Sequence, residues 1–369
     1  MKAENSKLSQ KIGIVGDALA PYFNEALANQ MRLLSRELNL PVLTCNDIGF
    51  TPFKRMDNYL IVNGKFLRED SRKPLLSLLN GAFFYPFLKL FERSHDVIIL
   101  SGGINSGFLS HSKLEKCVLV MNSLPFPKES KETREFARKF APRLKGIVAQ
   151  SNRIKEKLLE IGVEAERIHL IYPWVDLNKF KPTQPPPLDE FRLLFASAPN
   201  AEIPGENIFE EKGIPLLLEA FKEFAKEHKA KLCFLWRGYY KDALRTKIRE
   251  LGLGDMVEVV NEVVDTPKLI SESHIVVIPF LNTRRSPEIP LSAVESLACG
   301  RPIVATDVVE IAEIIQEHEC GCVSKPLTGD FALALRECER SYQIYQGNCR
   351  KVVEGLFSLK ARGDFQDLI

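Results

Sequence analysis

The chain has 369 residues, of which 45% are apolar and 27% charged, and its net charge is +2. This balance is typical of a folded globular protein with about two domains and excludes a disordered chain. No apolar run approaches the roughly 20 residues that a membrane helix needs, and the polar start MKAENSKLSQ is unlike a secretion signal. Eight scattered cysteines without a Cys-x-x-Cys pair argue against a disulfide framework and structural zinc. We therefore expect a cytoplasmic protein with reduced thiols.

Charge is distributed unevenly along the chain. Residues 1–188 contain 28 Lys and Arg against 19 Asp and Glu, a net of +9, whereas residues 189–369 have a net of −7. This asymmetry indicates that the first half meets an anionic surface or substrate, or that it has a solvated basic face without a partner. Nucleic acid is disfavoured, because the lysines are not gathered with exposed aromatic residues on one stripe.

Short apolar runs alternate with amphipathic segments twice along the chain. Buried strands are expected in the first half at 11–17, 40–45, 96–100, 116–121, 146–150 and 168–173. A helix is expected over 24–37, and another follows the N-cap residue Ser151 and ends at Gly162. Further strands are expected at 192–197, 231–236, 257–260, 274–279 and 302–306. Continuous apolar strands between helices predict parallel sheets that are covered on both faces.

The proline-rich segment 181–191 separates the two series. It has four prolines among residues 181–187, which cannot continue a helix or a central strand, and it predicts a stiff interdomain linker. Ligands of open α/β sheets bind beyond the carboxyl ends of the strands, so the loops there are the candidate sites.

The segment 287–315 is the most informative part of the sequence. A helix is expected to start at Pro290, with Leu291, Val294 and Leu297 as its apolar stripe, and to end at Gly300. The N–H groups at such a helix start can bind an anion, and Glu295 one turn later can accept hydrogen bonds from sugar hydroxyls. The pattern predicts a seat for a diphosphate and a ribose, or else a helix with a solvated glutamate.

Three stretches of the sequence resemble the retaining glycosyltransferases of family 4, which belong to glycosyl transferases group 1. They are Glu295-Ser-Leu-Ala-Cys-Gly-Arg-Pro-Ile-Val-Ala-Thr, the run 146–182 with Val175-Asp176 and Phe180-Lys-Pro, and EKGIPLLLEAF at 211–221. The resemblance implies the α/β GT-B fold, in which two Rossmann-like parallel-sheet domains face each other across a cleft. It implies an acceptor domain over 1–182, a donor domain over 183–340, and carboxyl-terminal helices over 341–369 that pack back toward the first domain.

The resemblance also implies roles on the donor side. Glu295 would hold the ribose hydroxyls of the donor, and Lys212 would bind the diphosphate and stabilise charge on the leaving group. The backbone N–H groups of Leu291 and Ser292 would contact the phosphate, and the loop that contains Asn261, Val263 and Val264 would receive the base. The alternatives are a solvated Lys212, a simple capping role for Ser292 and an ordinary loop after the strand.

The sequence departs from the family in two places. Pro287 replaces the first glutamate of the motif, so that Glu288, one position later, either contacts the donor sugar in its place or is a surface carboxylate. The arginine that usually follows the first strand of the second domain is also missing, since Ala196-Ser-Ala-Pro occupies its place. Arg237, next to Gly238, can supply that charge or form a salt bridge, and Arg284 and Arg285 are the other candidates for phosphate contact.

Candidate acceptor-side residues follow strands of the first half. They are Asp17, Asn24, Gly102, Gly103 and Asn122. Asn122 stands where many relatives have a histidine, and Asn24 can equally begin a helix. The stretch Lys73–Arg93 is rich in Leu and Phe, flanked by basic residues and interrupted by Gly81 and Pro86. It is interpreted as a peripheral contact with the inner face of a membrane, or as a helical hairpin packed on its domain.

The expected activity is transfer of a sugar, with retention of configuration, from a nucleoside-diphosphate-sugar to a lipid-linked or glycan acceptor. No metal and no cofactor besides the nucleotide-sugar co-substrate is expected, because side-chain cations can neutralise the diphosphate. Three alternatives stay open: a non-catalytic nucleotide-sugar binder or accessory subunit, another GT-B chemistry such as epimerisation or phosphorolysis, and an unrelated two-domain α/β binding protein.

Overall fold

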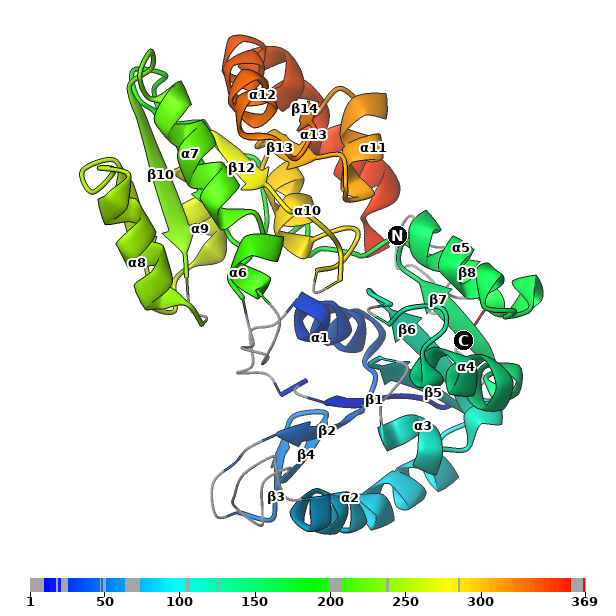
Figure 1. The fold of residues 1–369 in the computed structure, drawn as a ribbon. Helices are drawn as coiled ribbons and strands as arrows, with labels where there is room; N and C mark the ends of the chain where they lie inside the picture. Colours follow the sequence, from blue (N-terminus) through cyan, green and yellow to red (C-terminus); the bar gives the residue numbers. More distant parts are fainter. Residues whose placement is uncertain are drawn as a thin grey trace, which may run out of the picture. The chain divides into compact units, whose positions relative to one another are not determined.

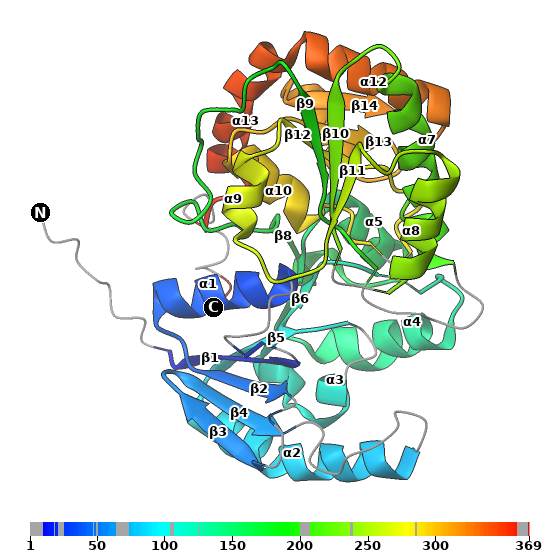
Figure 2. The ribbon, with the colours of Figure 1, turned by 90° about the vertical axis from the view of Figure 1, so that its left-hand side faces the viewer.

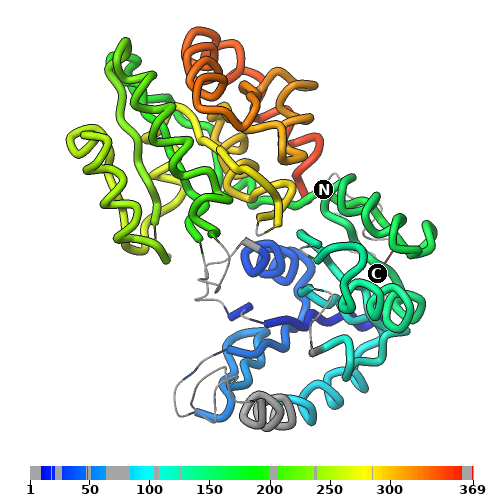
Figure 3. The backbone as a smooth tube through the Cα atoms, in the orientation of Figure 1, coloured from blue at the N-terminus to red at the C-terminus, as the bar shows by residue number. Residues whose placement is uncertain are grey.

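The structure is a computed structural model. It describes residues 10–17, 19–20, 26–46, 48, 51–63, 74–103, 107–124, 126–199, 207–236, 239–284, 286–359 and 368. The chain divides into two compact units: unit 1 holds residues up to Ile171 with a short carboxyl-terminal portion, and unit 2 holds Tyr172–Ala361. Figure 3 follows the backbone from blue to green through unit 1 and from green to red through unit 2.

Unit 1 is built on an eight-stranded sheet in the order β3-β4-β2-β1-β5-β6-β7-β8. All neighbouring strands are parallel except β3, which pairs antiparallel with β4 at the edge. The strands are β1 (Ile12–Asp17), β2 (Val42–Asn46), β3 (Phe53–Met56), β4 (Tyr59–Asn63), β5 (Val97–Ser101), β6 (Cys117–Met121), β7 (Gly146–Ala149) and β8 (Ile168–Leu170). Its helices are α1 (Ala26–Leu38), α2 (Pro74–Ser94), α3 (Gly107–His111), α4 (Lys131–Glu135) and α5 (Asn152–Glu160).

The central strands of unit 1 are buried on both faces, as the continuous apolar runs predict. Every residue of β5, β6 and β7 is buried, including Ile98, Leu119 and Ile147, whose side chains share one core cluster. The predicted N-cap is confirmed, since the Ser151 hydroxyl accepts a hydrogen bond from the N–H of Ile154 at 3.1 Å. The expected interruption of the Leu- and Phe-rich stretch is wrong, because α2 continues as one helix with Pro86 inside it.

Unit 2 is built on a six-stranded parallel sheet in the order β11-β10-β9-β12-β13-β14. The strands are β9 (Phe191–Phe195), β10 (Ala230–Leu235), β11 (Val257–Val260), β12 (Ile275–Ile278), β13 (Ile303–Thr306) and β14 (Gly321–Ser324). The helices are α6 (Ile208–Glu211), α7 (Ile214–Phe224), α8 (Lys241–Glu250), α9 (Thr266–Ser271), α10 (Leu291–Ala298), α11 (Ile311–Glu317), α12 (Thr328–Arg340) and α13 (Tyr342–Leu356). Figure 1 shows both sheets with their helices, and in Figure 2 α7 and α8 lie on one side of β10 and β11, with α9 and α10 on the other.

Two segments of unit 2 bear on the expected domain organisation. The division between the units falls at 171/172, so the proline-rich segment 181–191, expected as an interdomain linker, lies within unit 2. Its main chain is bonded there: the His274 ring contacts the carbonyl of Pro186 at 3.1 Å. Helix α13 packs against α10 in unit 2, whereas Leu368 lies beside Gly146 of β7 in unit 1.

None of the helices in the described part of the chain has the length and apolar character that a membrane span requires. All eight cysteines are unpaired.

Candidate functional site

A close approach of two loops builds the candidate site in unit 2. The turn between α6 and α7 contains Gly213, whose φ is +67°, and a Cβ at this position would lie 1.7 Å from the carbonyl oxygen of Pro279. Only glycine tolerates both the left-handed conformation and this contact. The N–H of Leu281 donates to the carbonyl of Glu211 at 2.8 Å. The turn is thereby fixed against the chain that leaves β12, at the carboxyl end of the sheet.

Lys212 is held in this turn with its ammonium group inside the protein. The residue is only 7% exposed. Its Nζ donates to the hydroxyl of Ser286 at 3.1 Å and lies 4.7 Å from the centroid of the Phe280 ring. The ring stabilises the cation through its negative face, and both partners belong to the loop between β12 and α10. A buried cation therefore bonds to the loop that leads into the motif helix.

Glu288 lies in the same loop, and it is buried rather than a surface carboxylate. Its Oε1 accepts a hydrogen bond from the hydroxyl of Thr283 at 3.0 Å. Its carbonyl accepts a bond from the N–H of Ile311 at 3.2 Å, which ties the loop to the start of α11. The offset of one residue from the family motif therefore leaves a carboxylate in the loop that contains the partner of Lys212.

Helix α10 starts after Pro290, one residue later than the sequence predicts, and its eight residues are all buried. The first N–H groups of a helix have no partner within the helix, so they carry partial positive charge. The hydroxyl of Ser292 in this first turn lies 3.0 Å from the hydroxyl of Ser197. Ser197 follows β9, so the start of α10 and the loops after β9 and β12 meet at one edge of the sheet.

Glu295 lies one turn further along α10 and is 8% exposed. Burial raises the pKa of Glu295 to about 7, and the nearby ammonium group of Lys179 acts in the opposite direction. The carboxylate therefore titrates near neutral pH. An ionised Glu295 would be a strong acceptor for hydroxyl groups, because its charge is poorly solvated by water.

Of the three arginine candidates, the structure describes Arg284. Arg284 is exposed, and its guanidinium pairs with the carboxylate of Glu211 at 3.5 Å, next to Lys212. Arg237, Gly238 and Arg285 lie outside the described residues, so their predicted contacts with phosphate stay predictions.

The loop predicted to receive the base follows β11. The side-chain amide of Asn261 fits its surroundings when the nitrogen donates to the carbonyl of Trp236 at 2.6 Å and the oxygen accepts from Lys241 Nζ at 2.5 Å. This bond joins the ends of β10 and β11. Val263 is 80% exposed and Val264 is half-buried. The exposed side chain of Val263, beside the ends of these strands, can pack against the face of a flat ligand.

The candidate acceptor-side residues follow three neighbouring strands of unit 1. Asp17 ends β1, Gly102 and Gly103 follow β5, and Asn122 follows β6. Asp17 is exposed as a residue, but its carboxyl group is partly shielded from water by neighbouring atoms, which raises the pKa of that group. The amide oxygen of Asn122 accepts a bond from the neighbouring Ser123 hydroxyl at 3.4 Å. Asn24 lies outside the described residues.

Further bonds at this edge of unit 1 hold the main chain after β1, and the side-chain amide of Gln150, which follows β7, donates to that of Gln30 at 2.7 Å. The N–H of Leu19 donates to the hydroxyl of Thr44 at 2.9 Å, and the N–H of Ala20 donates to the amide oxygen of Asn46 at 3.1 Å. The loop after β1 is thereby fixed to β2, while the side chain of Asp17 is left facing solvent.

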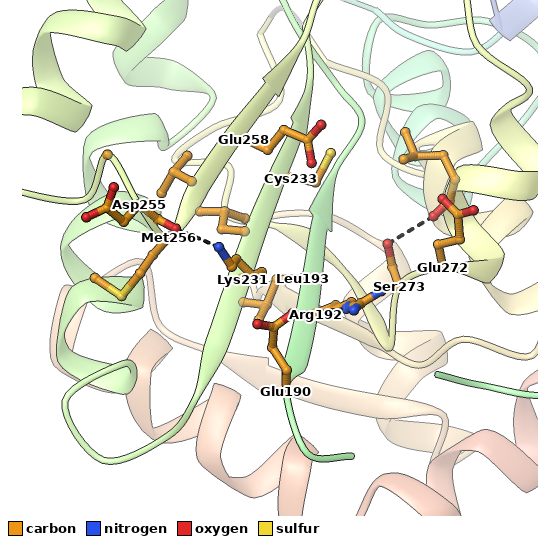
Figure 4. A pocket seen from close by; sticks show the side chains of 14 residues that line it. Glu190, Arg192, Leu193, Lys231, Cys233, Asp255, Met256, Glu258, Glu272 and Ser273 are labelled. Carbon is orange, nitrogen blue, oxygen red and sulfur yellow. Dashed lines mark hydrogen bonds and ion pairs between the residues drawn. The ribbon is translucent and has the colours of Figure 1, made fainter. Parts of the chain in front are cut away.

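A cavity of about 480 Å³ lies at the opposite edge of the sheet in unit 2, away from these loops. Figure 4 shows its charged lining, in which Arg192, Lys231 and Glu258 come from the first halves of β9, β10 and β11. The Lys231 ammonium donates to the carbonyl of Asp255 at 2.6 Å. Strand ends at this edge are the amino ends, where ligands of open parallel sheets are not expected. Among the described residues, no cluster of three His, Cys, Asp or Glu could hold a metal ion.

Comparison with solved structures identifies the fold. Sucrose-phosphate synthase from Thermosynechococcus elongatus superimposes with a TM-score of 0.76 at 17% identity, over 95% of this chain and 96% of that one. A glycosyltransferase from Rickettsia africae gives 0.71 at 16% identity, over 98% of both chains. HepE from Anabaena, in complex with UDP and glucose, gives 0.72 at 16% identity, over 97% and 98%. The chain has the GT-B fold of glycosyltransferases.

The family resemblance is shown in unit 2. Residues 204–340 match the family of glycosyl transferases group 1. No curated protein matches the sequence significantly. The GT-B fold and the matched segment together support a glycosyl transfer function, and they locate the resemblance in the unit that contains Lys212, Glu288 and Glu295.

Sequence reasoning missed three side chains at the site. Ser286 and Phe280 are the partners of Lys212, and Ser197 is the partner of Ser292. Ser286 precedes the Pro287 that replaces the family glutamate, so a polar residue beside the lost carboxylate was the available signal. Phe280 and Ser197 have no such signal, because their positions become meaningful only when the strand ends meet.

Proposed function

We propose that the protein transfers a sugar, with retention of configuration, from a nucleoside-diphosphate-sugar to a lipid-linked or glycan acceptor. The observation that supports this most is the buried ammonium of Lys212, which hydrogen-bonds in the loop that leads into α10. A buried cation bonded to the loop that leads into a helix start is suited to a diphosphate, because the cation and the helix start both favour negative charge.

In the proposed reaction, the bond between the anomeric carbon and the diphosphate oxygen breaks, and a bond from the acceptor oxygen to that carbon forms on the same face. The acceptor's hydroxyl proton passes to the departing diphosphate. Negative charge builds on the leaving group as its bond breaks. Lys212 and the N–H groups of Leu291 and Ser292 stabilise that charge without reorganising, which is electrostatic stabilisation of the transition state.

The carboxylates orient the donor in this proposal. Glu295 accepts hydrogen bonds from the ribose hydroxyls, and Glu288 contacts the transferred sugar. Asn261, Val263 and Val264 line the place of the base, while Arg284 and the arginines at 237 and 285 add positive charge around the diphosphate. With these cations, no metal ion is required. HepE was solved with UDP and glucose, so UDP-sugars are the first donors to test.

A thermal-shift screen of UDP-, GDP- and ADP-sugars tests donor binding without knowledge of the acceptor. A donor at about 100 times its dissociation constant stabilises the folded protein by roughly 3 kcal/mol, and the matching nucleoside diphosphate alone should also stabilise it. Release of nucleoside diphosphate in the presence of candidate acceptors then tests transfer. If no nucleotide changes the melting temperature, the proposed function fails.

The acceptor side is proposed to include Asp17, Gly102, Gly103 and Asn122, and to work close to a membrane. Exposed aromatic and apolar side chains on α2 and β3 support this. Phe53 and Phe87 rings pack at 5.8 Å, and Lys89 lies 5.1 Å from the ring centroid of Tyr85. Phe53, Tyr85 and Leu90 are exposed, which suits an interface with anionic lipid.

Vesicle sedimentation tests this surface. Vesicles with anionic lipid should pull down the protein more than neutral vesicles do, and Leu90→Ser should reduce the bound fraction several-fold. Equal sedimentation with both vesicle types would argue for a soluble glycan acceptor.

A non-catalytic nucleotide-sugar binder is the second candidate, and Pro287 in place of the family glutamate favours it. Binding of a nucleotide sugar without release of the diphosphate, over a panel of lipid-linked and glycan acceptors, would support that candidate.

A further inference from the structure

The carboxyl-terminal end of α10 is held by two arginines from different parts of unit 2. Arg301 is fully buried and follows the helix. Its Nη1 donates to the carbonyl of Cys299 at 3.3 Å and to that of Gly300 at 3.4 Å. Arg350 of α13 donates from Nη1 to the carbonyl of Ala298 at 3.0 Å. The last carbonyls of a helix carry partial negative charge and have no partner within the helix, so two guanidinium groups stabilise this end.

The same two arginines bind the segment 177–184, which runs from the start of unit 2 toward β9. Arg301 donates to the carbonyl of Thr183 at 3.1 Å and to its hydroxyl at 2.8 Å. Arg350 donates to the carbonyl of Phe180 at 2.8 Å and to that of Leu177 at 3.4 Å. Each guanidinium therefore joins this segment to the end of α10.

The segment brings Lys179 close to Glu295: Lys179 precedes Phe180, whose carbonyl shares Arg350 Nη1 with the carbonyl of Ala298, three residues after Glu295 on α10. The Lys179 ammonium lies 5.3 Å from the centroid of the Phe180 ring. The carboxylate of Asp176 accepts bonds from the N–H groups of Asn178 at 2.9 Å and Lys179 at 3.1 Å, which shapes the turn that presents Lys179. The ammonium of Lys179 favours the ionised form of Glu295. Among the described residues, the thiol of Cys299, one turn further along, also interacts electrostatically with Glu295, and burial raises the pKa of this thiol to about 11, so that it stays neutral.

We propose that Arg301 and Arg350 are positioning residues for the donor site, which fix the segment 177–184 to α10 so that Lys179 stays beside Glu295. The two arginines do not touch the donor in this account and act through Lys179 and Glu295. The inference deepens the proposed function and rests on it, because Glu295 is taken to bind the ribose in its ionised form.

Two measurements on Arg350→Met test whether Arg350 fixes the segment 177–184 to α10. The comparison is Lys179→Met, which removes the cation beside Glu295 and leaves Arg350 in place. The first is hydrogen exchange of the segment 177–184, which needs no ligand and should become at least several-fold faster in Arg350→Met and not in Lys179→Met. The second is the affinity for UDP between pH 6 and 9. In both variants, the pH at which half the maximal affinity is reached should rise by several tenths of a unit or more, because Glu295 then loses its proton only at higher pH.

Arg336→Met is the matched control. Arg336 of α12 is exposed to a similar extent, 28% against 25% for Arg350, and it also bonds a carboxylate, that of Glu227, and a main-chain carbonyl, that of Glu223. It should leave both measurements unchanged. Arg301→Lys is a second test, since a single ammonium cannot replace the forked contacts of the guanidinium, and it should show the same upward shift.

The outcomes separate the two claims. If the unmodified protein binds no nucleoside diphosphate, the proposed function fails, while the exchange measurement still decides whether Arg350 holds the segment. If the protein binds UDP but Arg350→Met keeps the unmodified pH profile and exchange rates, the positioning role is wrong. A loss of affinity at all pH values without a shift would assign Arg350 a purely structural role and would also overturn the inference.

Discussion

In unit 2, the side chains beyond the carboxyl ends of the strands bond to one another, through Lys212 with Ser286, Thr283 with Glu288 and Ser197 with Ser292. In unit 1, bonds at the corresponding edge hold the main chain of Leu19 and Ala20, and the side chains of Gln150 and Gln30 bond each other, while Asp17 is exposed. Both sheets are mainly parallel, but Lys212 and Glu288 of unit 2 are buried, whereas Asp17 of unit 1 is exposed. We therefore expect changes at Lys212 to affect both the packing of unit 2 and the proposed binding of a diphosphate, and changes at the exposed Asp17 to have little effect on the fold.

Replacing Lys212 should give the largest effect on function. Lys212→Ala removes the buried cation, and loss of one well-placed group that stabilises a leaving charge costs about 3–4 kcal/mol, or roughly 100- to 1,000-fold in rate. The rate of nucleoside diphosphate release measures this. Lys226→Ala is the control, because the ammonium of Lys226 is exposed and pairs with the carboxylate of Glu223 on the surface. An unchanged rate in Lys212→Ala would show that Lys212 does not stabilise the charge on the leaving group.

Gly213→Ala should give the largest effect on stability. The added methyl group would overlap the carbonyl of Pro279, and the alanine would have to adopt a positive φ. The free energy of unfolding should therefore fall by about 3 kcal/mol or more. Gly252→Ala is the matched control: its φ is +69°, with no atom within 4 Å of the added Cβ, so it should lose only about 1 kcal/mol. Urea denaturation measures both. Equal losses would mean that the approach of the two loops is not essential.

Glu295→Gln should separate stability from function. The pKa of Glu295 is raised to about 7 from an ordinary 4.5, so the folded state holds this proton more tightly than the unfolded state. Its contribution to the free energy of unfolding therefore falls as pH rises from about 4.5 to 7, by up to roughly 3 kcal/mol. At pH 8, Glu295→Gln should be more stable than the unmodified protein, and near pH 4.5 the two should be alike.

The same substitution should weaken binding of the matching nucleoside diphosphate by about tenfold at pH 8, because an amide is a poorer acceptor than a carboxylate. The exposed Glu156 provides the control, since Glu156→Gln should change neither stability nor affinity. Lower stability of Glu295→Gln at pH 8 would show that the carboxylate is stabilised in the folded protein, contrary to this account.

Substitutions in unit 1 should have the smallest effect on donor binding. Asp17→Asn and Asn122→Ala are expected to leave the affinity for the nucleoside diphosphate within about twofold and the free energy of unfolding within about 1 kcal/mol. Their effect should appear only in the rate of transfer to an acceptor. A large loss of nucleotide affinity in either variant would contradict the assignment of donor binding to unit 2.

Most strands could be predicted because buried parallel strands are continuous apolar runs. Strand β3 was missed because it is a short edge strand with the polar sequence FKRM, and β14 because GCVS has no apolar run. Strand β4 was missed although YLIVN is a short, mostly buried apolar run. Helix α2 was expected to be interrupted, but the chain on both sides of Pro86 stays helical.

The candidate site could be predicted only in part. Lys212, Glu288 and Glu295 stand in local motifs, so the sequence singles them out, and the structure brings Lys212 and Glu288 into contact with one loop. The partners Ser286 and Ser197 could not be assigned, because they depend on which strand ends lie side by side. The positioning role of Arg301 and Arg350 could not be predicted either, because both bind main-chain carbonyls, which any sequence can provide.

The most direct measurement is a crystal structure of the protein with the nucleoside diphosphate that stabilises it most. We expect diphosphate oxygens about 3 Å from Lys212 Nζ and from the N–H groups at the start of α10. A nucleotide found instead in the 480 Å³ cavity beside Arg192 and Lys231 would contradict it.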